Sequence, residues 1–269
     1  ILRDETLVYD IIREDLYELK EKYGDDRRTL ITDEEAAEFR IEDLIADEEV
    51  AVTVSHEGYI KRVPVETYRR QGRGGRGVRG SDSKEGDWLE RLFIASTLDY
   101  LLIFTTRGRV YRLRVYDVPS MSRTSRGRSI ANLVRLQGEE KITCIMPVRE
   151  ISDRYVVMAT RLGLIKKTPL SAFANLRSNG IIAISLDAND SLIGVTMTVG
   201  TDELVLGTSD GLSIRFAESE VRAMGRTARG VKAIRLRKGD AVVDMAVAEP
   251  NGSLLTVCEH GYGKRTNID

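Results

Sequence analysis

Basic side chains are the residues of this chain whose types and spacing suggest chemistry. They gather at two recurring places: just after a glycine that follows a short apolar run, and in a small glycine-containing loop 17 to 19 residues later. Guanidinium and ammonium groups form charge-assisted hydrogen bonds with phosphate oxygens, so this recurrence predicts a polyanion-binding band. The first set is Lys61, Arg62, Arg109, Arg112, Arg114, Lys166, Lys167, Arg215, Lys264 and Arg265, and the second is Arg69, Arg70, Arg73, Arg76, Arg79, Arg123, Arg126, Arg128, Arg177, Arg222, Arg226 and Arg229.

For any one of these cations the alternative is that it only solvates the outer strand of a repeat. Their collective placement favours a binding band, because equivalent positions of stacked repeats lie at the same radius and height. The glycine loops contain no interleaved aromatic residues on which unpaired bases could stack. Duplex nucleic acid is therefore favoured over single strands.

Residues that could catalyse a reaction form no recognisable site. His56 and His260 occupy the same position in two predicted hairpin turns, and Cys144 and Cys258 lie in apolar runs without a nearby base. No phosphate-binding loop with a following Lys-Ser/Thr stands between a strand and a helix. We therefore expect no active site, no metal site and no cofactor in this chain.

Composition and charge suggest two parts with different roles. Of the 269 residues, 42% are apolar, which predicts one or two packed domains. Residues 1–50 carry 18 acidic and 7 basic side chains, although the net charge of the whole chain is only −1. No apolar run approaches the roughly 20 residues of a membrane span, no signal peptide is evident, and the two cysteines are far apart, so we expect a soluble cytoplasmic protein. A start without methionine suggests a fragment.

The acidic part is predicted to begin with a helix over residues 4–23. Apolar residues recur there at steps of four and three, and Gly24 ends the pattern. This spacing approximates a coiled-coil seam, with an amphipathic helix docked on its own domain as the alternative. An acidic connector over residues 33–48 follows, and its opposite charge suggests the hypothesis, which the sequence does not decide, that it competes with DNA for the basic band. The apolar positions are Val8, Ile12, Leu16, Leu19 and Tyr23.

From residue 49 onward the pattern is a β-repeat of about 50 residues. Each unit starts with a hairpin, followed by the glycine loop, a strand such as 129–133, 181–186 or 231–236, and a later apolar run. Four strands per unit are typical of a propeller blade, which must stack on its neighbours to bury both faces. Four blades are expected near 49–98, 99–152, 153–200 and 201–250, with a partial fifth at 251–269; the ring is either open or cut. The hairpin glycines are Gly58, Gly108, Gly163, Gly211 and Gly261.

These residues resemble a known family. The segments 108–111, 221–225 and 261–266 are similar to the C-terminal DNA-wrapping domain of the DNA gyrase A subunit, and residues 1–32 resemble the end of its coiled-coil arm. One segment matches the gyrase A box, Gln-Arg-Arg-Gly-Gly-Lys-Gly, at five of seven positions. That segment consists of Gln71, Gly72, Arg73, Gly74, Gly75, Arg76 and Gly77.

The resemblance implies a mainly β fold, a propeller-like β-pinwheel over residues 49–269 whose blades exchange a strand with their neighbours. It implies that duplex DNA is wrapped around the basic rim, which directs ATP-dependent negative supercoiling by the holoenzyme. The implied partners are the gyrase B subunit, together with the other A subunit of the A2B2 enzyme, whereas ATP, Mg²⁺ and the catalytic tyrosine belong to other parts of it. We expect the box glycines to let the backbone approach a phosphate closely.

Two other functions stay open. The C-terminal domain of topoisomerase IV shares the blades but lacks a full box, and would tether DNA without strong wrapping. A propeller that serves as a protein-interaction platform would instead present an apolar or acidic face.

Overall fold

The computed structural model describes residues 5–26, 29, 41–68, 86–138, 140–176 and 179–268. The chain divides into two compact units, Ile1–Ile41 and Glu42–Asp269, which are described separately. No helix in the described ranges is long and apolar enough to cross a bilayer.

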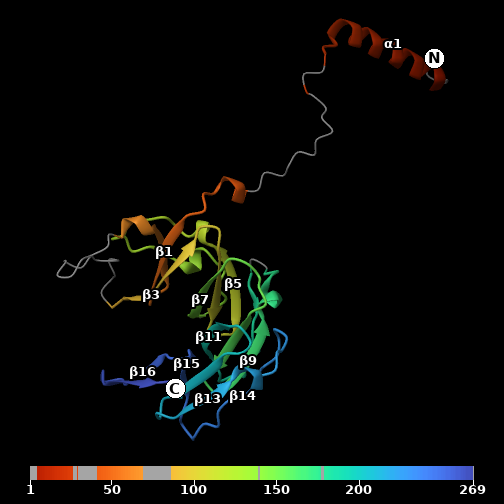
Figure 1. Cartoon of the computed structure of the whole chain (residues 1–269). Helices are drawn as coiled ribbons and strands as arrows, with labels where there is room; N and C mark the ends of the chain where they lie inside the picture. The colour runs from red at the N-terminus through yellow and green to blue at the C-terminus, as the bar shows by residue number, and fades with distance from the viewer. Residues whose placement is uncertain are drawn as a thin grey trace. The chain divides into compact units, whose positions relative to one another are not determined.

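The described part of the first unit contains one helix, α1 (Glu5–Tyr23), as the apolar spacing predicts (Figure 1). The helix ends where expected, with the Gly24 N–H donating to the Lys20 carbonyl at 2.8 Å. Within its unit α1 buries no side chain, and Leu16 and Leu19 are more than half exposed. The first half of the predicted acidic connector, residues 33–40, lies outside the described residues.

The second unit is a series of antiparallel sheets, here called blades 1 to 5, joined by short 3₁₀ turns. Blade 1 has the order β3-β1-β2-β6, blade 2 the order β10-β5-β4-β7 and blade 3 the order β11-β8-β9-β14. The strands of blade 1 are β1 (Glu49–Ser55), β2 (Tyr59–Pro64), β3 (Leu89–Ser96) and β6 (Arg128–Ser129). Those of blade 2 are β4 (Tyr100–Thr105), β5 (Arg109–Arg114), β7 (Ile142–Val148) and β10 (Ile181–Ile182), and those of blade 3 are β8 (Tyr155–Thr160), β9 (Leu164–Pro169), β11 (Leu192–Thr198) and β14 (Val231–Lys232).

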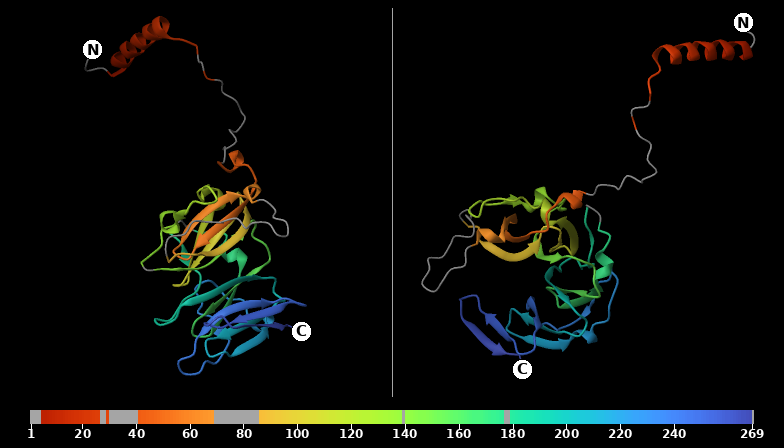
Figure 2. Two further views of the ribbon diagram at one scale, coloured as in Figure 1. Left: turned by 90° about the vertical axis from the view of Figure 1, so that its left-hand side faces the viewer. Right: turned by 45° about the horizontal axis from the view of Figure 1, so that its top comes forward.

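Blades 4 and 5 have fewer strands in the described part of the chain. Blade 4 has the order β13-β12-β15, and blade 5 is a hairpin. Their strands are β12 (Glu203–Thr208), β13 (Ser213–Ala217), β15 (Val242–Ala248), β16 (Ser253–Val257) and β17 (Gly263–Asn267). Successive blades lie side by side in chain order, from the orange blade 1 to the blue blade 5 (Figure 2).

The assignment of the strand after each glycine loop to its own repeat is wrong. The observed strands at these places are only two residues long, and they pair with the preceding blade: Tyr59 with Ser129, Arg109 with Ile182, and Ile165 with Val231. The physical reason is that the loop crosses the edge of the hairpin in the preceding blade. The carbonyl of that hairpin's turn glycine then accepts a hydrogen bond from the backbone that follows the loop, as from the Ala233 N–H to the Gly163 carbonyl at 2.9 Å. The strand exchange implied by the family resemblance is thus confirmed.

The core lies between blades rather than within them. One apolar cluster joins blades 1 and 2, with Val52 and Ile60 packed in the same group as Leu101 and Ile103. Two further clusters continue this packing, the last one bringing Val157 of blade 3 together with Leu204 of blade 4. Blades 1 to 4 therefore bury apolar faces against one another, as the repeat predicts, whereas Leu255 and Val257 of blade 5 are exposed.

Candidate nucleic-acid interface

The predicted arginine loops lie across the junctions between blades. Two of them are fully described, the 120–128 loop, which crosses from blade 2 to blade 1, and the 223–230 loop, which crosses from blade 4 to blade 3. Their starts are held by parallel bridges, Arg62 with Ser120 and Lys167 with Ala223. The counterpart between blades 2 and 3 includes Arg177, which is outside the described residues.

Both loops present arginines at their surface. Arg128, Arg222 and Arg229 are exposed, and Arg123, Arg126 and Arg226 are half-buried. Because the loops occupy equivalent places in the repeat, these six guanidinium groups recur from one junction to another. They are the described members of the second predicted set and are here called the arginine band.

Two members of the arginine band already have acidic partners. Arg126 lies 3.2 Å from Glu57 and stacks over the Tyr59 ring at 4.1 Å, and Arg229 lies 2.9 Å from Asp187. Both ion pairs are solvent-exposed, and such pairs contribute about 0–1 kcal/mol. A phosphate can therefore replace or share the carboxylate at a small energetic cost.

The loop glycines are required by the crossing itself. Gly127 and Gly230 have φ values of 95° and 98°, a region that disfavours side chains. A β-carbon at Gly127 would lie 2.8 Å from the Ile60 carbonyl oxygen. In these described loops the glycine thus allows close approach to a neighbouring blade. The Gln71–Gly77 box, where the sequence predicts approach to a phosphate, lies outside the described residues, as do Arg69, Arg70 and Arg79.

The structure contradicts the prediction that Lys166 and Lys167 contact DNA. Lys166 is 0% exposed and Lys167 is 7% exposed. Lys166 Nζ donates to the carbonyls of Ala183, at 2.6 Å, and Arg226, and burial, with the nearby Arg226 charge, lowers its pKa to about 8. Lys167 Nζ donates to the Glu218 carbonyl at 3.0 Å and lies 3.6 Å from that carboxylate. Successive side chains of β9 point to opposite faces, yet neither lysine reaches solvent, because the next blade covers this strand.

Several arginines of the first set also contact the following blade. Arg109 Nη2 donates to the carbonyls of Asn179 and Gly180 at 3.0 and 3.1 Å, and Arg112 Nη1 donates to the Ala174 carbonyl at 2.9 Å. Arg215 binds Glu203 and the Ile268 carbonyl. These guanidinium groups hold blade junctions together, whereas Lys264 and Arg265 are exposed on β17. Arg109, Arg112 and Arg215 thus have a structural role, which leaves their predicted DNA contact a prediction.

Two exposed cations beside the 223–230 loop are missed by the sequence prediction. Lys232 and Arg235 are exposed, whereas Val231, Ala233 and Ile234 pack on the core between blades 3 and 4. The signal that could have found them is the alternation of apolar and basic residues directly after Gly230. They extend the basic surface along the edge of blade 3.

The candidate catalytic residues have ordinary surroundings. His56 stacks on Trp88 with ring centroids 4.0 Å apart, and its Nδ1 lies 3.1 Å from Glu90. Burial raises the pKa of the Cys144 thiol, which disfavours a nucleophilic thiolate. Across the described ranges no three His, Cys, Asp or Glu residues are grouped to hold a metal ion.

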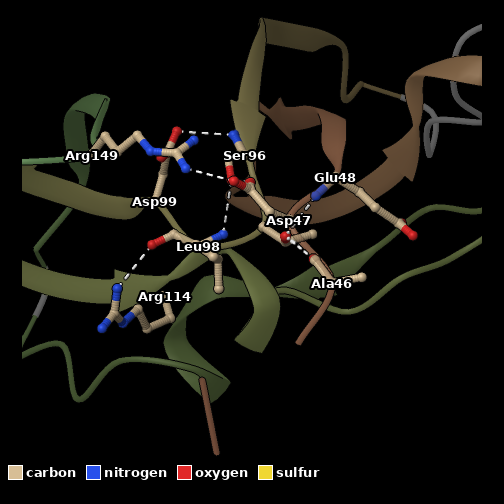
Figure 3. Close-up of polar contacts among 9 residues, drawn as sticks. Ala46, Asp47, Glu48, Ser96, Leu98, Asp99, Arg114 and Arg149 are labelled. Carbon is tan, nitrogen blue, oxygen red and sulfur yellow. Dashed lines mark hydrogen bonds and ion pairs between the residues drawn. The ribbon is translucent and has the colours of Figure 1, made fainter. Parts of the chain in front are cut away.

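The end of the predicted acidic connector is part of the blade unit. Asp47 Oδ2 lies 2.5 Å from the Arg149 guanidinium, and Glu42 pairs with Arg114. Hydrogen bonds from Arg149 and then Ser96 hold the pKa of Asp47 below its ordinary value. Figure 3 shows the surroundings of Asp47, where the turn that contains Ser96, Leu98 and Asp99 receives residues 46–48. Two carboxylates from the connector side thus neutralise two arginines of blade 2.

Comparisons with known proteins agree with this architecture. A family model described as DNA gyrase C-terminal domain, beta-propeller, matches residues 49–96, 99–149, 154–198 and 202–249. The DNA gyrase A protein of Staphylococcus aureus (strain NCTC 8325) is 44% identical over 273 residues, which cover 100% of this chain and 31% of that protein. The chain therefore spans less than a third of the length of this relative.

Two solved structures have a similar fold. A crystal structure of the C-terminal domain of DNA topoisomerase IV has a TM-score of 0.70 and 30% identity, covering 83% of this chain and 68% of that one. A structure of a DNA gyrase A C-terminal domain has a TM-score of 0.65 and 27% identity, covering 82% of this chain and 72% of that one.

Proposed function

Because the chain belongs to the family of DNA gyrase C-terminal domains, we propose that it binds duplex DNA along the arginine band and wraps it around the blades. The observation that carries the proposal is the recurrence of exposed arginines on loops that cross equivalent blade junctions. Such a surface follows a backbone rather than reading bases, because the described part of the blade unit offers no α-helix for the major groove.

The energetics support binding that is spread over several blades. Bending 20–30 base pairs by 40–90° costs on the order of 1–6 kcal/mol, which a single exposed contact does not offset. Each described loop contributes three arginines, counting Arg222 with the 223–230 loop, and Lys232 and Arg235 add charge beside one of them. Contacts at more than one junction turn the bend into additional binding surface.

In the intact protein we place this chain in a type II topoisomerase. The chiral wrap presents a DNA segment to the rest of the enzyme, where strand passage and ATP hydrolysis occur. The proposed partners are the gyrase B subunit, together with the other A subunit of the enzyme. On this proposal the chain binds and bends DNA and does not cleave it.

A second candidate is a DNA tether of the topoisomerase IV type. The similarity to the solved topoisomerase IV domain favours it. The box-like segment Gln71–Gly77 favours the gyrase type, because the resemblance implies that a full box accompanies wrapping.

One experiment separates the two candidates. A nicked plasmid is incubated with increasing amounts of the chain, ligated and deproteinised, and its linking number is read on a gel. A positive shift that grows with protein supports chiral wrapping. Tight binding without a shift supports the tether, and no binding at low salt contradicts both.

A further inference from the structure

Two fully buried lysines lie behind the arginine band. Lys61 is 1% exposed and Lys166 is 0% exposed. They occupy the same place in the repeat, three residues after the hairpin glycines Gly58 and Gly163. At that place blade 2 has Tyr111, which is also 0% exposed.

Each lysine reaches into the next blade's arginine loop. Lys61 Nζ donates to the carbonyls of Ser122, at 3.4 Å, Ser125, at 2.6 Å, and Arg123. Lys166 Nζ donates to the Arg226 carbonyl. Tyr111 contacts the corresponding Gly180, where a β-carbon would lie 2.6 Å from the ring.

Burial of an ammonium group costs several kcal/mol unless hydrogen bonds satisfy it. Here the acceptors are backbone carbonyls that the loop turns inward, and they would lose their donors if the lysine were absent. The side chains of the same residues, Arg123 and Arg226, belong to the arginine band. The lysine bonds therefore fix the loop backbone from which these guanidinium groups extend.

We propose that Lys61 and Lys166 are positioning residues for DNA binding, each holding the arginine loop of the following blade in the arrangement that meets the phosphates. Lys61 acts on the 120–128 loop and Lys166 on the 223–230 loop. The expected effect of the two lysines on DNA binding rests on the proposed function, whereas their effect on the loops can be tested without DNA.

The two lysines provide matched controls for each other, because K61M and K166M each replace one buried ammonium by an apolar chain of similar length. By native-state hydrogen exchange, K166M should speed exchange of the 223–230 amides by about tenfold or more and leave the 120–128 amides unchanged. K61M should do the reverse. The inference is overturned if each variant changes the exchange rates of both loops equally, or changes neither, relative to the wild type. If one variant does not fold, the other carries the test.

DNA binding supplies the second measurement. Because log affinity falls with log salt at about 0.9 per phosphate contact, the loss of one or two contacts should reduce the slope by about 1–2 in each variant. K238M, which removes an exposed lysine, should keep the wild-type slope. If the wild-type chain binds duplex DNA and both K61M and K166M keep its salt slope, the positioning role is overturned but the proposed function is not. A wild-type chain that binds no duplex contradicts the proposed function, and with it the role of both lysines.

Discussion

Gly230 crosses the carbonyl group of Ile165 so closely that a β-carbon on the glycine would lie 2.4 Å from the carbonyl oxygen. Gly127 has the same relationship with Ile60 at an earlier blade junction in the repeat series. These contacts bring the arginine loop of one blade onto the edge strand of another. The proposed binding surface and the blade junction are therefore the same structure, and a change in one should alter the other.

Substitution of Gly230 by alanine should destabilise the blade unit. The new β-carbon meets a backbone oxygen, and φ is positive, so we expect a loss of roughly 2 kcal/mol or more in the free energy of unfolding. Urea unfolding measures this. The matched control is Gly225→Ala in the same loop, where the added β-carbon meets nothing within 4 Å. Equal stability of the two variants would contradict the role of the crossing.

Loss of arginines from one loop should weaken DNA binding in proportion to the lost phosphate contacts. R126A with R128A removes two members of the arginine band, so the log–log salt slope should fall by about 1.8. Fluorescence anisotropy with duplex DNA at several salt concentrations measures the slope. R107A with R237A removes two exposed arginines outside the band and should change the slope less. Equal losses would mean that only net charge matters.

The box should control wrapping more than binding. Arg73→Ala with Arg76→Ala should abolish the linking-number shift while substantial affinity for DNA is retained, because the described loops still contribute their arginines. The plasmid ligation assay and anisotropy together measure this difference. An unchanged shift in the double variant rejects the role that the resemblance assigns to the box.

Removal of the connector's carboxylates should strengthen DNA binding. Glu42 and Asp47 neutralise Arg114 and Arg149, so E42Q with D47N releases two guanidinium groups. An exposed pair such as Asp47–Arg149 is worth about 0.2–1 kcal/mol, so the release of that pair alone corresponds to an affinity gain of up to roughly fivefold. Glu48→Gln with Glu49→Gln, which removes two exposed carboxylates outside both pairs, is the control for net charge. No gain beyond that of the control refutes competition between the connector and DNA.

Stability should depend on pH through Lys166. Its pKa is about 8 in the folded chain and 10.5 as the ordinary value, so between these values the unfolded state binds more protons. The free energy of unfolding of the wild type, measured relative to K166M, should therefore rise as the pH increases from about 8 to 10.5. Urea unfolding of both proteins at pH 7.5, 8.5 and 9.5 measures this difference. A constant or falling difference contradicts the lowered pKa of the buried lysine.

Much of the fold is determined locally and can be predicted from the residues. The hairpin glycines, such as Gly58 and Gly163, recur because a tight turn with positive φ needs them wherever the unit is repeated. The apolar runs between them predict strands, and their period of about 50 residues predicts stacked blades. The helix α1 follows from apolar spacing and Gly24 in the same way.

Only the tertiary structure decides which blade each short strand joins and where each cation points. Ser129 belongs by sequence to the second repeat but pairs with Tyr59 of the first, because the free edge of strand β2 lies across the junction from it. Lys166 and Arg229 both look like rim cations in the sequence, yet one is buried against backbone carbonyls and the other is exposed. Residue types and spacing set local conformation, whereas burial and strand partners depend on contacts between segments that are far apart in the sequence.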